Sequence, residues 1–312
     1  MFTKTFFKLF PPPKFLNIHY AGLDISDDAV HCIDFSKGIS SYKLHRYGSI
    51  PLKAGVVEGG HIKNEAELGA AIHSLTKSLR IHTVKASLPE ERMYLFKTEI
   101  ANAREDEIRQ KIDFKLEENV PLAAKDAIFF YDRIPDINKN GKIQASVSVA
   151  PKELVDSYLK VISAAGVQVI SFEIQAKAIA HAVVPRDSIE TQIIVNSMNR
   201  KVGIYIVCGG VVCFTSTLAI EKGADISILQ RELNKVYTYW LDYGDGAPIN
   251  RIILAGCDAV RVGGFSNLSP DPKIPVELAQ IWRNAFSNAH HIPKLKHDDS
   301  LEYAVAAGLA LP

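Results

Sequence analysis

The hydrophobic and polar positions of this chain follow one pattern twice, and each copy predicts three short strands, a helix and a further strand. The first copy predicts its strands at residues 18–25, 30–35, 41–47 and 83–88, with polar turn signals between the first three. Its helix begins after Asn64, because Glu67 three residues later completes a capping-box pattern. Leu68, Ile72 and Leu75 then recur at helical spacing on one face.

The second copy predicts strands at residues 193–196, 202–207, 211–216 and 251–254. Gly209 and Gly210 form a two-residue hairpin turn between its second and third strands. The helix, which starts near Ala224, places Leu229 and Leu233 on one apolar face. Two such α/β units that face each other are expected to form a cleft between domains, which is a usual place for a ligand.

The region between the two copies does not fit the repeat and predicts a small inserted α/β subdomain. Its pattern indicates strands at 93–100, 127–132 and 143–150 and helices at 104–119 and 153–165. A run of small residues at 172–182 predicts a connecting helix that crosses between the domains. The Ala- and Gly-rich segment 301–310 predicts a second helix suited to close packing.

A chain of 312 residues is long for a single core, so two domains are expected. The predicted organisation is a tail at 1–16, a first domain from 17–91 and 296–312, the insert at 92–171, the connecting helix at 172–190, and a second domain at 191–295. With 47% hydrophobic and 23% charged residues, the composition is that of a folded, water-soluble protein.

Charge and cysteine content exclude some classes of function. A formal net charge of +1 offers no bulk attraction for nucleic acid, so no nucleic-acid partner is expected. The four cysteines form no Cys-x-x-Cys pair, which favours reduced thiols over a metal site. The longest apolar stretch, 202–214, has 13 residues and is too short to span a bilayer as a helix.

Residues 1–16 mix phenylalanine with lysine, contain no acidic residue and end in a run of prolines. Two interpretations stay open for this tail. It is either a basic, aromatic segment that lies on an anionic membrane surface, or a tail that is disordered or docks on its own domain.

Several motifs together resemble the PilM family of type IV pilus assembly proteins, which belong to the actin-like superfamily. They are the Gly-Leu-Asp-Ile run at 22–25, the Val-Pro pair at 120–121 after an acidic helix, the run at 152–158, and the small-residue segment at 304–310. The resemblance implies an α/β, duplicated actin-like (ribonuclease H-like) fold with two domains around a central cleft and a small inserted subdomain. It also implies ATP and Mg²⁺ between the two halves.

By this resemblance, the phosphates would lie between a hairpin from each half. Asp24 is retained in the first hairpin and would organise Mg²⁺ through water, but Ser26 stands where relatives have glycine. The second hairpin supplies Asn196, Ser197 and Asn199, and it differs from the family because Asn196 carries no charge for Mg²⁺.

Other positions in and near this predicted site also depart from the family. Met198 in the second hairpin is bulky where the backbone should approach a phosphate, and Arg200 and Lys201 either pair with phosphate or are surface charges of the turn. On the adenosine side, Glu232 and Lys235 occupy the contact positions, and only Gly256 remains of a multi-glycine loop. The nucleotide site is therefore expected to be degenerate.

The favoured functional hypothesis is a cytoplasmic scaffold at the inner face of the cytoplasmic membrane. It would recruit the N-terminal tail of a PilN-like inner-membrane protein into a groove between the first domain and the insert. Candidate walls of this groove are Met93, Leu95, Phe129 and Tyr131, which equally suit the ordinary core of the insert.

The rival hypothesis is an active Mg-ATP-binding, actin-like ATPase, with Glu173 as the candidate base. A filament tether similar to FtsA would need an amphipathic membrane helix at the C-terminus, whereas this sequence stops at Pro312 directly after the small-residue helix. Membrane contact through residues 1–16 and self-association stay open as further expectations.

Overall fold

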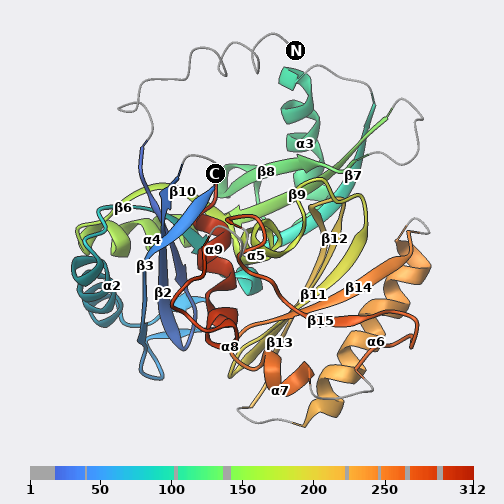
Figure 1. Ribbon diagram of the computed structural model, residues 1–312. Helices are drawn as coiled ribbons and strands as arrows, with labels where there is room; N and C mark the ends of the chain where they lie inside the picture. Colours follow the sequence, from blue (N-terminus) through green and yellow to red (C-terminus); the bar gives the residue numbers. More distant parts are fainter. Residues whose placement is uncertain are drawn as a thin grey trace, which may run out of the picture.

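The structure is a computed structural model that describes residues 18–38, 41–101, 105–135, 142–221, 225–244, 247–263, 268–286 and 291–312. The tail expected at residues 1–16 lies outside this described part. Two five-stranded sheets form the two halves of the molecule, and a three-stranded sheet lies across one end of both (Figure 1). Most of the predicted strands and helices are present, so the α/β class is confirmed.

The first sheet has the strand order β10-β6-β1-β2-β3. The strands β1, β2 and β3 are joined as antiparallel hairpins, whereas β6 and β10 run parallel to β1 and to each other. Their bounds are Ala21–Ile25 (β1), Ala29–Lys37 (β2), Tyr42–Pro51 (β3), Thr83–Leu88 (β6) and Gln168–Ile174 (β10).

The second sheet repeats this arrangement with the order β13-β12-β11-β14-β15, so the predicted duplication is confirmed. Again the first three strands form antiparallel hairpins and the last two run parallel. Gly209 and Gly210 have φ angles of 54° and 83°, which is the backbone that a two-residue primed turn requires. The bounds are Thr191–Ser197 (β11), Lys201–Cys208 (β12), Val211–Ala219 (β13), Ile249–Ala255 (β14) and Val276–Leu278 (β15).

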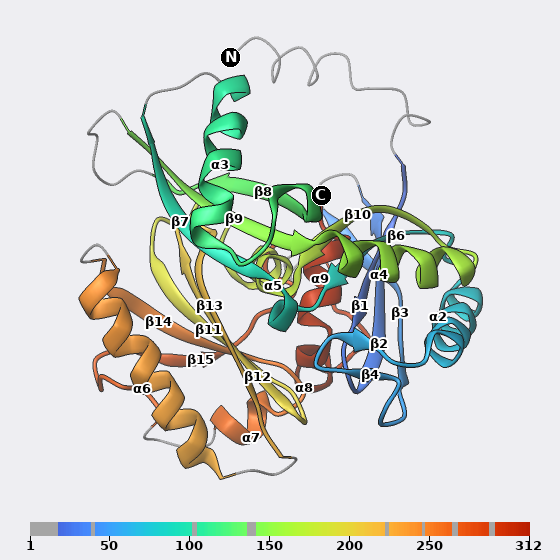
Figure 2. The same cartoon turned by 180° about the vertical axis from the view of Figure 1, so that it is seen from behind.

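The amphipathic helices cover the outer faces of these sheets, as both views show (Figures 1 and 2). The helix α2, Glu65–Leu79, begins where the Asn64 side chain accepts a hydrogen bond from the Glu67 N–H, so the predicted cap is confirmed. It packs beside α4, Lys152–Ala164, on the first half. On the second half, α6 spans Ile226–Tyr243 and buries Leu229 and Leu233.

Two small-residue helices lie between the sheets and join the halves (Figure 1). They are α5, Gln175–Val183, and α9, Ala304–Ala310, and both are almost entirely buried. At Gly308 a Cβ atom would come within 1.6 Å of the Ala178 carbonyl oxygen, so the two backbones cross in direct contact. The predicted close packing is thereby confirmed.

The insert is smaller than the sequence predicted. It consists of β7 (Tyr94–Ala101), α3 (Glu105–Asn119), β8 (Ala127–Arg133) and β9 (Lys142–Pro151), and its strand order is β7-β9-β8. The helix α4 and the strand β10, which the prediction placed in the insert, instead pack on and extend the first sheet. The apolar residues of α4 decide this, because they join the core beneath α2.

The predicted helix at 172–182 is wrong in its first three residues. Phe172, Glu173 and Ile174 belong to β10, since they pair with Ala86, Ser87 and Leu88 of β6. Short elements that the sequence did not predict are β4 (Val57–Glu58), β5 (His61–Ile62), α7 (Ala259–Gly263), α8 (His297–Ser300) and the 3-10 turns η2 (Glu90–Arg92), η3 (Ala124–Asp126) and η4 (Leu301–Tyr303). Within the described part of the chain, none of the helices is long and apolar enough to cross a membrane.

Candidate functional site

In the first predicted phosphate hairpin, Asp24 lies near the carboxyl end of β1 and is 3% exposed. One oxygen of its carboxylate, Oδ1, accepts hydrogen bonds from Ser87 Oγ at 2.7 Å and from Gln175 Nε2 at 3.0 Å. The Ser87 hydroxyl in turn accepts from the Ile25 N–H. Asp24 is therefore held by β6 and by the first turn of α5.

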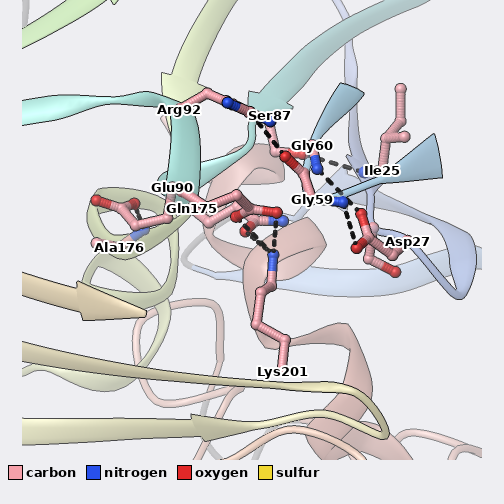
Figure 3. Close-up of polar contacts among 12 residues, drawn as sticks. Ile25, Asp27, Gly59, Gly60, Ser87, Glu90, Arg92, Gln175, Ala176 and Lys201 are labelled. Carbon is pink, nitrogen blue, oxygen red and sulfur yellow. Dashed lines mark hydrogen bonds and ion pairs between the residues drawn. The ribbon is translucent and has the colours of Figure 1, made fainter. Parts of the chain in front are cut away.

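The turn after Asp24 uses its own polar groups internally. The Ser26 hydroxyl is 3.0 Å from the Ala29 carbonyl oxygen and 3.1 Å from the Ala29 nitrogen, so it closes the turn. The Asp27 carboxylate accepts hydrogen bonds from the N–H groups of Gly59 at 2.8 Å and Gly60 at 3.2 Å, in the turn between β4 and β5 (Figure 3). An acidic side chain thus occupies two neighbouring backbone donors of the kind that bind anions.

The β4–β5 turn is fixed from two other sides. Arg92 Nε donates to the Gly59 carbonyl oxygen at 2.9 Å, and the buried Tyr158 hydroxyl donates to the Gly60 carbonyl oxygen at 3.0 Å. Gly60 has φ +74°, and a Cβ there would come within 2.6 Å of Pro89. The turn therefore connects the first hairpin to η2 and to α4.

From the second hairpin, Lys201 reaches across to the first half of the molecule. Its Nζ lies 2.9 Å from one Glu91 carboxylate oxygen. It also lies 3.3 Å from Gln175 Oε1 (Figure 3). The side chains of Lys201 and Glu91 are only 13% and 16% exposed, so the interpretation of Lys201 as a surface charge is wrong. Arg200 fits that interpretation, because it is 57% exposed and only approaches Asp28, at 3.6 Å.

We use the term junction for this set of contacts: the first hairpin turn at 24–28, the Gly59–Gly60 turn, η2, Gln175 and the second hairpin at 196–201. Within η2 the Glu90 carboxylate, which is 3% exposed, accepts a hydrogen bond from the Ala176 N–H at 3.0 Å (Figure 3). Burial raises the pKa of Glu90 to about 7, although the Ala176 hydrogen bond and the nearby Lys201 charge act in the opposite direction.

The predicted residues of the second hairpin are mostly buried by their neighbours. Asn196 and Ser197 are 6% and 2% exposed, and Met198 is 8% exposed. The fully buried Tyr205 lies over Gly203, where a Cβ would come within 2.1 Å of the phenol oxygen. Asn199 is half-buried in the turn itself. A large aromatic side chain therefore fills space beside this hairpin.

On the predicted adenosine side, Gly256 packs against the second hairpin, and Lys235 pairs with Glu232 and lines a cavity along α6. Gly256 has φ +91°, and a Cβ there would come within 2.2 Å of the Ser197 carbonyl oxygen, so this glycine lets β14 approach the end of β11. Glu232 and Lys235 pair with each other at 3.0 Å along α6. In the residues that the structure describes, neither one forms an ion pair with the junction.

Glu173, the candidate base, points along α5. Its carboxylate is 3.7 Å from Lys177 Nζ and 3.5 Å from His181 Nδ1. Burial acts to raise its pKa, but the hydrogen bond and charge of His181, together with Lys177, outweigh burial and hold the pKa below its ordinary value. A carboxylate with a lowered pKa is a weak base, which does not favour the assigned role.

The four residues predicted to wall a partner groove lie on opposite faces of the insert. Leu95 packs toward the core that surrounds the second sheet, and Met93, directly before β7, packs against both that core and the core of the first half. Phe129 and Tyr131 pack in the core beneath α3, and Phe129 is 6% exposed. Alternation along β7 and β8 separates the pairs, so the four do not line one surface.

A groove is nevertheless present between the insert and the first half. It has a volume of about 650 Å³, and Leu122, Pro151 and Ser157 contribute to its lining. The charged lining residues are Glu65, Asp126, Lys152, Glu153, Asp156 and Lys160. Lys160 Nζ binds Glu65 at 2.7 Å, whereas Asp126, Glu153 and Asp156 form no ion pair with another described residue. We call this concavity the groove; none of the four predicted wall residues lines it.

The residues at the junction do not fit an ATP–Mg²⁺ group. The two glycine N–H donors already bind Asp27, Lys201 already binds Glu91, and Asn196 offers no charge to a cation. No cluster of three or more His, Cys, Asp or Glu side chains suited to a metal is present in the part of the chain that the structure describes.

Several residues of the junction and the groove were not predicted from the sequence. The charged triplet Glu90, Glu91 and Arg92 follows β6 directly, and a run of charges at the carboxyl end of a buried parallel strand was an available signal. The Gly59–Gly60 pair was another, since adjacent glycines mark a special backbone. Gln175 has no ionisable group that could act as a base, and its amide connects Asp24 to Lys201.

Comparison with known proteins gives a family and a fold. The family model described as type IV pilus assembly protein PilM matches residues 22–215, which is more than half of the chain. No curated protein sequence matches this chain. Among solved structures, a PilM–PilN type IV pilus biogenesis complex is similar with a TM-score of 0.76 at 16% identity, covering 94% of this chain and 98% of that one.

Two further structures share the fold at lower similarity. The ethanolamine utilization protein EutJ from Carboxydothermus hydrogenoformans has a TM-score of 0.51 at 12% identity, with 96% of this chain and 90% of that chain covered. The cytoplasmic domain of EpsL from the Vibrio cholerae type II secretion system has a TM-score of 0.51 at 11% identity, with 92% and 94% covered. The expected duplicated actin-like fold is confirmed.

Proposed function

This chain belongs to the PilM family of type IV pilus assembly proteins, and from that premise we propose that it is a non-catalytic scaffold with a degenerate nucleotide junction. The scaffold recruits the N-terminal tail of a PilN-like inner-membrane protein, and so works in the cytoplasm at the inner face of the cytoplasmic membrane. The observation that carries this proposal is the contrast between a junction filled by its own side chains and a groove whose carboxylates Asp126, Glu153 and Asp156 form no ion pair with another described residue.

Energetics support the degenerate junction. A nucleotide phosphate would have to displace the Asp27 carboxylate from Gly59 and Gly60, or lie beside it. Two like charges about 4 Å apart repel by roughly 4 kcal/mol near a protein surface, which is a large fraction of a millimolar binding energy. Releasing Lys201 for a phosphate would also leave Glu91 without its partner in a largely buried position.

Support for the partner comes from the groove and from the similar structure, which is a complex of PilM with PilN. The groove lies between the end of α3 and the start of α4, at the boundary of the insert with the first half, and the family resemblance implies an extended peptide between these two parts. An extended segment in such a groove gains main-chain hydrogen bonds and a few apolar anchors. The excess of carboxylates over lysines selects a peptide that carries basic residues.

The nucleotide part of the proposal is tested by calorimetric titration of the protein with Mg-ATP, followed by a phosphate-release assay on the same sample. We expect no heat of binding at millimolar nucleotide and no phosphate release. Tight binding with turnover would give first place to the alternative function, an active actin-like ATPase.

The partner part is tested by titrating the protein with a synthetic peptide of the N-terminal tail of a PilN-like protein from the same genome. Glu153→Lys and Asp156→Lys are expected to weaken binding about 10-fold each, because each replaces attraction by repulsion at the groove. Asp271→Lys, an equal charge change in the second half, serves as the matched control and leaves the affinity unchanged. Equal loss in all three variants, or no binding to the wild-type chain, contradicts the assignment of the groove.

A further inference from the structure

We propose that residues 1–16 of this chain bind in the groove and compete there with the partner peptide. The assignment of the groove as a partner site rests on the proposed function. The competition by the protein's own tail goes beyond that function and has its own test. Of the interpretations that the sequence left open, it corresponds to a tail that docks on its own domain.

The charges of the two surfaces are complementary. After Lys160 and Glu65 neutralise each other, the groove presents Asp126, Glu153 and Asp156 against Lys152 alone, a net charge of about −2. Residues 1–16 carry Lys4, Lys8 and Lys14 and no acidic residue. Three unpaired carboxylates on one concave surface repel one another, and a cationic segment removes that repulsion.

The apolar groups also match. Leu122 and Pro151 line the groove, while Ile128 and Leu159, each one or two residues from a lining position, are 37% and 40% exposed. Aromatic side chains are suited to such sites, because they bury a large area at low entropic cost. The tail supplies five of them: Phe2, Phe6, Phe7, Phe10 and Phe15.

The tail is long enough to reach the groove. Seventeen residues precede Ile18, where the described chain begins, and they span up to roughly 56 Å when extended. A protein of this length has a diameter of about 50 Å, so the tail reaches sites on the same half of the molecule as Ile18. The groove is such a site, because α2 and α4 of the first half supply part of its lining.

Tethering makes even weak binding effective. A short linker gives an effective concentration of about 1 mM, so a tail with an intrinsic Kd of about 0.1 mM occupies the groove roughly ten times more often than it leaves it free. The apparent affinity of the partner peptide then falls by about 10-fold.

The test compares three full-length chains by titration with the same labelled PilN-like tail peptide: the wild type, the tail variant K4E/K8E/K14E, and the control K273E/K294E/K296E. The control reverses three exposed lysines of the second half and its C-terminal connection, so both variants change the net charge equally. We expect the tail variant to bind the peptide about 10-fold more tightly than the control. Hydrogen exchange of residues 122–126 and 152–157 should be slower in the wild type than in the tail variant.

The outcomes separate the two proposals. Equal peptide affinity of the tail variant and the control, with unchanged exchange at the groove, overturns the competition while the partner assignment stands. Failure of the peptide to bind any of the three chains contradicts the proposed function instead. Equal peptide affinities combined with sedimentation of the wild type, but not the tail variant, on vesicles of phosphatidylglycerol would show a membrane-binding tail and also overturn the competition.

Discussion

The junction and the groove are both polar surfaces between two parts of the molecule, but they differ in how their charges are satisfied. At the junction, Lys201 pairs with Glu91, and Asp27 binds two backbone N–H groups. At the groove, Asp126, Glu153 and Asp156 have no ionic partner among the described residues, and all three are exposed. Charges that are paired within the protein indicate a structural role, whereas exposed carboxylates that line a concavity remain available to a cationic partner.

The comparison also explains how a ligand site can become a structural element. A site that binds a charged ligand needs donors and charges without partners in the unliganded protein. When side chains of the chain itself take those places, the same positions hold the two halves together. The junction residues therefore contribute to stability, and the groove residues contribute to binding.

The largest effect is expected for Lys201→Ala. This substitution leaves Glu91, which is 16% exposed, without its partner between the two halves, and should lower the free energy of unfolding by about 3 kcal/mol. Urea denaturation monitored by tryptophan fluorescence measures the change. The matched control is Lys53→Ala: Lys53 is 83% exposed in its pair with Glu67, so water screens the pair and its loss should leave the unfolding free energy nearly unchanged. Equal effects of the two substitutions would remove the distinction between a buried and a surface pair.

A second, pH-dependent effect is expected at Glu90. Its folded pKa of about 7 lies above the ordinary value of 4.5, so the protonated carboxyl is favoured by the fold. The stabilising contribution of the protonated form is fully present below the unfolded pKa and is lost as the pH rises from 4.5 through about 7. Over that window the contribution amounts to about 3 kcal/mol.

Glu90→Gln isolates the pH-dependent contribution of Glu90 to stability. The amide keeps an oxygen that can accept from the Ala176 N–H, but it cannot ionise. The difference in unfolding free energy between variant and wild type should increase by about 3 kcal/mol between pH 4.5 and pH 8. Denaturation curves at four pH values across this window suffice. A difference that stays constant with pH would show that Glu90 ionises in the folded protein as it does in water.

The smallest effect on stability is expected at the groove. The double substitution Asp126→Asn and Asp156→Asn should change the unfolding free energy by no more than about 0.5 kcal/mol, with stabilisation expected from relieved repulsion. The same variant should bind the partner peptide several-fold more weakly. A loss of stability comparable to that of Lys201→Ala would mean that these carboxylates have structural partners, and the contrast between the two surfaces would disappear.

Local pattern predicted the repeated elements well, because each copy encodes its strands, turns and helix within about 70 residues. The Gly209–Gly210 turn and the Asn64 cap could be predicted from single residues with specific backbone requirements. The end of β10 and the start of α5 could not be predicted in this way. Pairing with β6 decides where β10 ends, and both Glu173 and Gln175 are residues that suit a helix. Likewise, Lys201 and Glu91 are 110 residues apart, and only the assembled fold brings them together.

The backbone contact between α5 and α9 limits how the two halves can move. Because α5 and α9 touch at Gly308 and Ala178 without intervening side chains, the spacing of the two halves is set by direct backbone contact. A Cβ atom at Gly308 would overlap the Ala178 carbonyl oxygen, so Gly308→Ala would force the two helices apart, and with them the two sides of the junction.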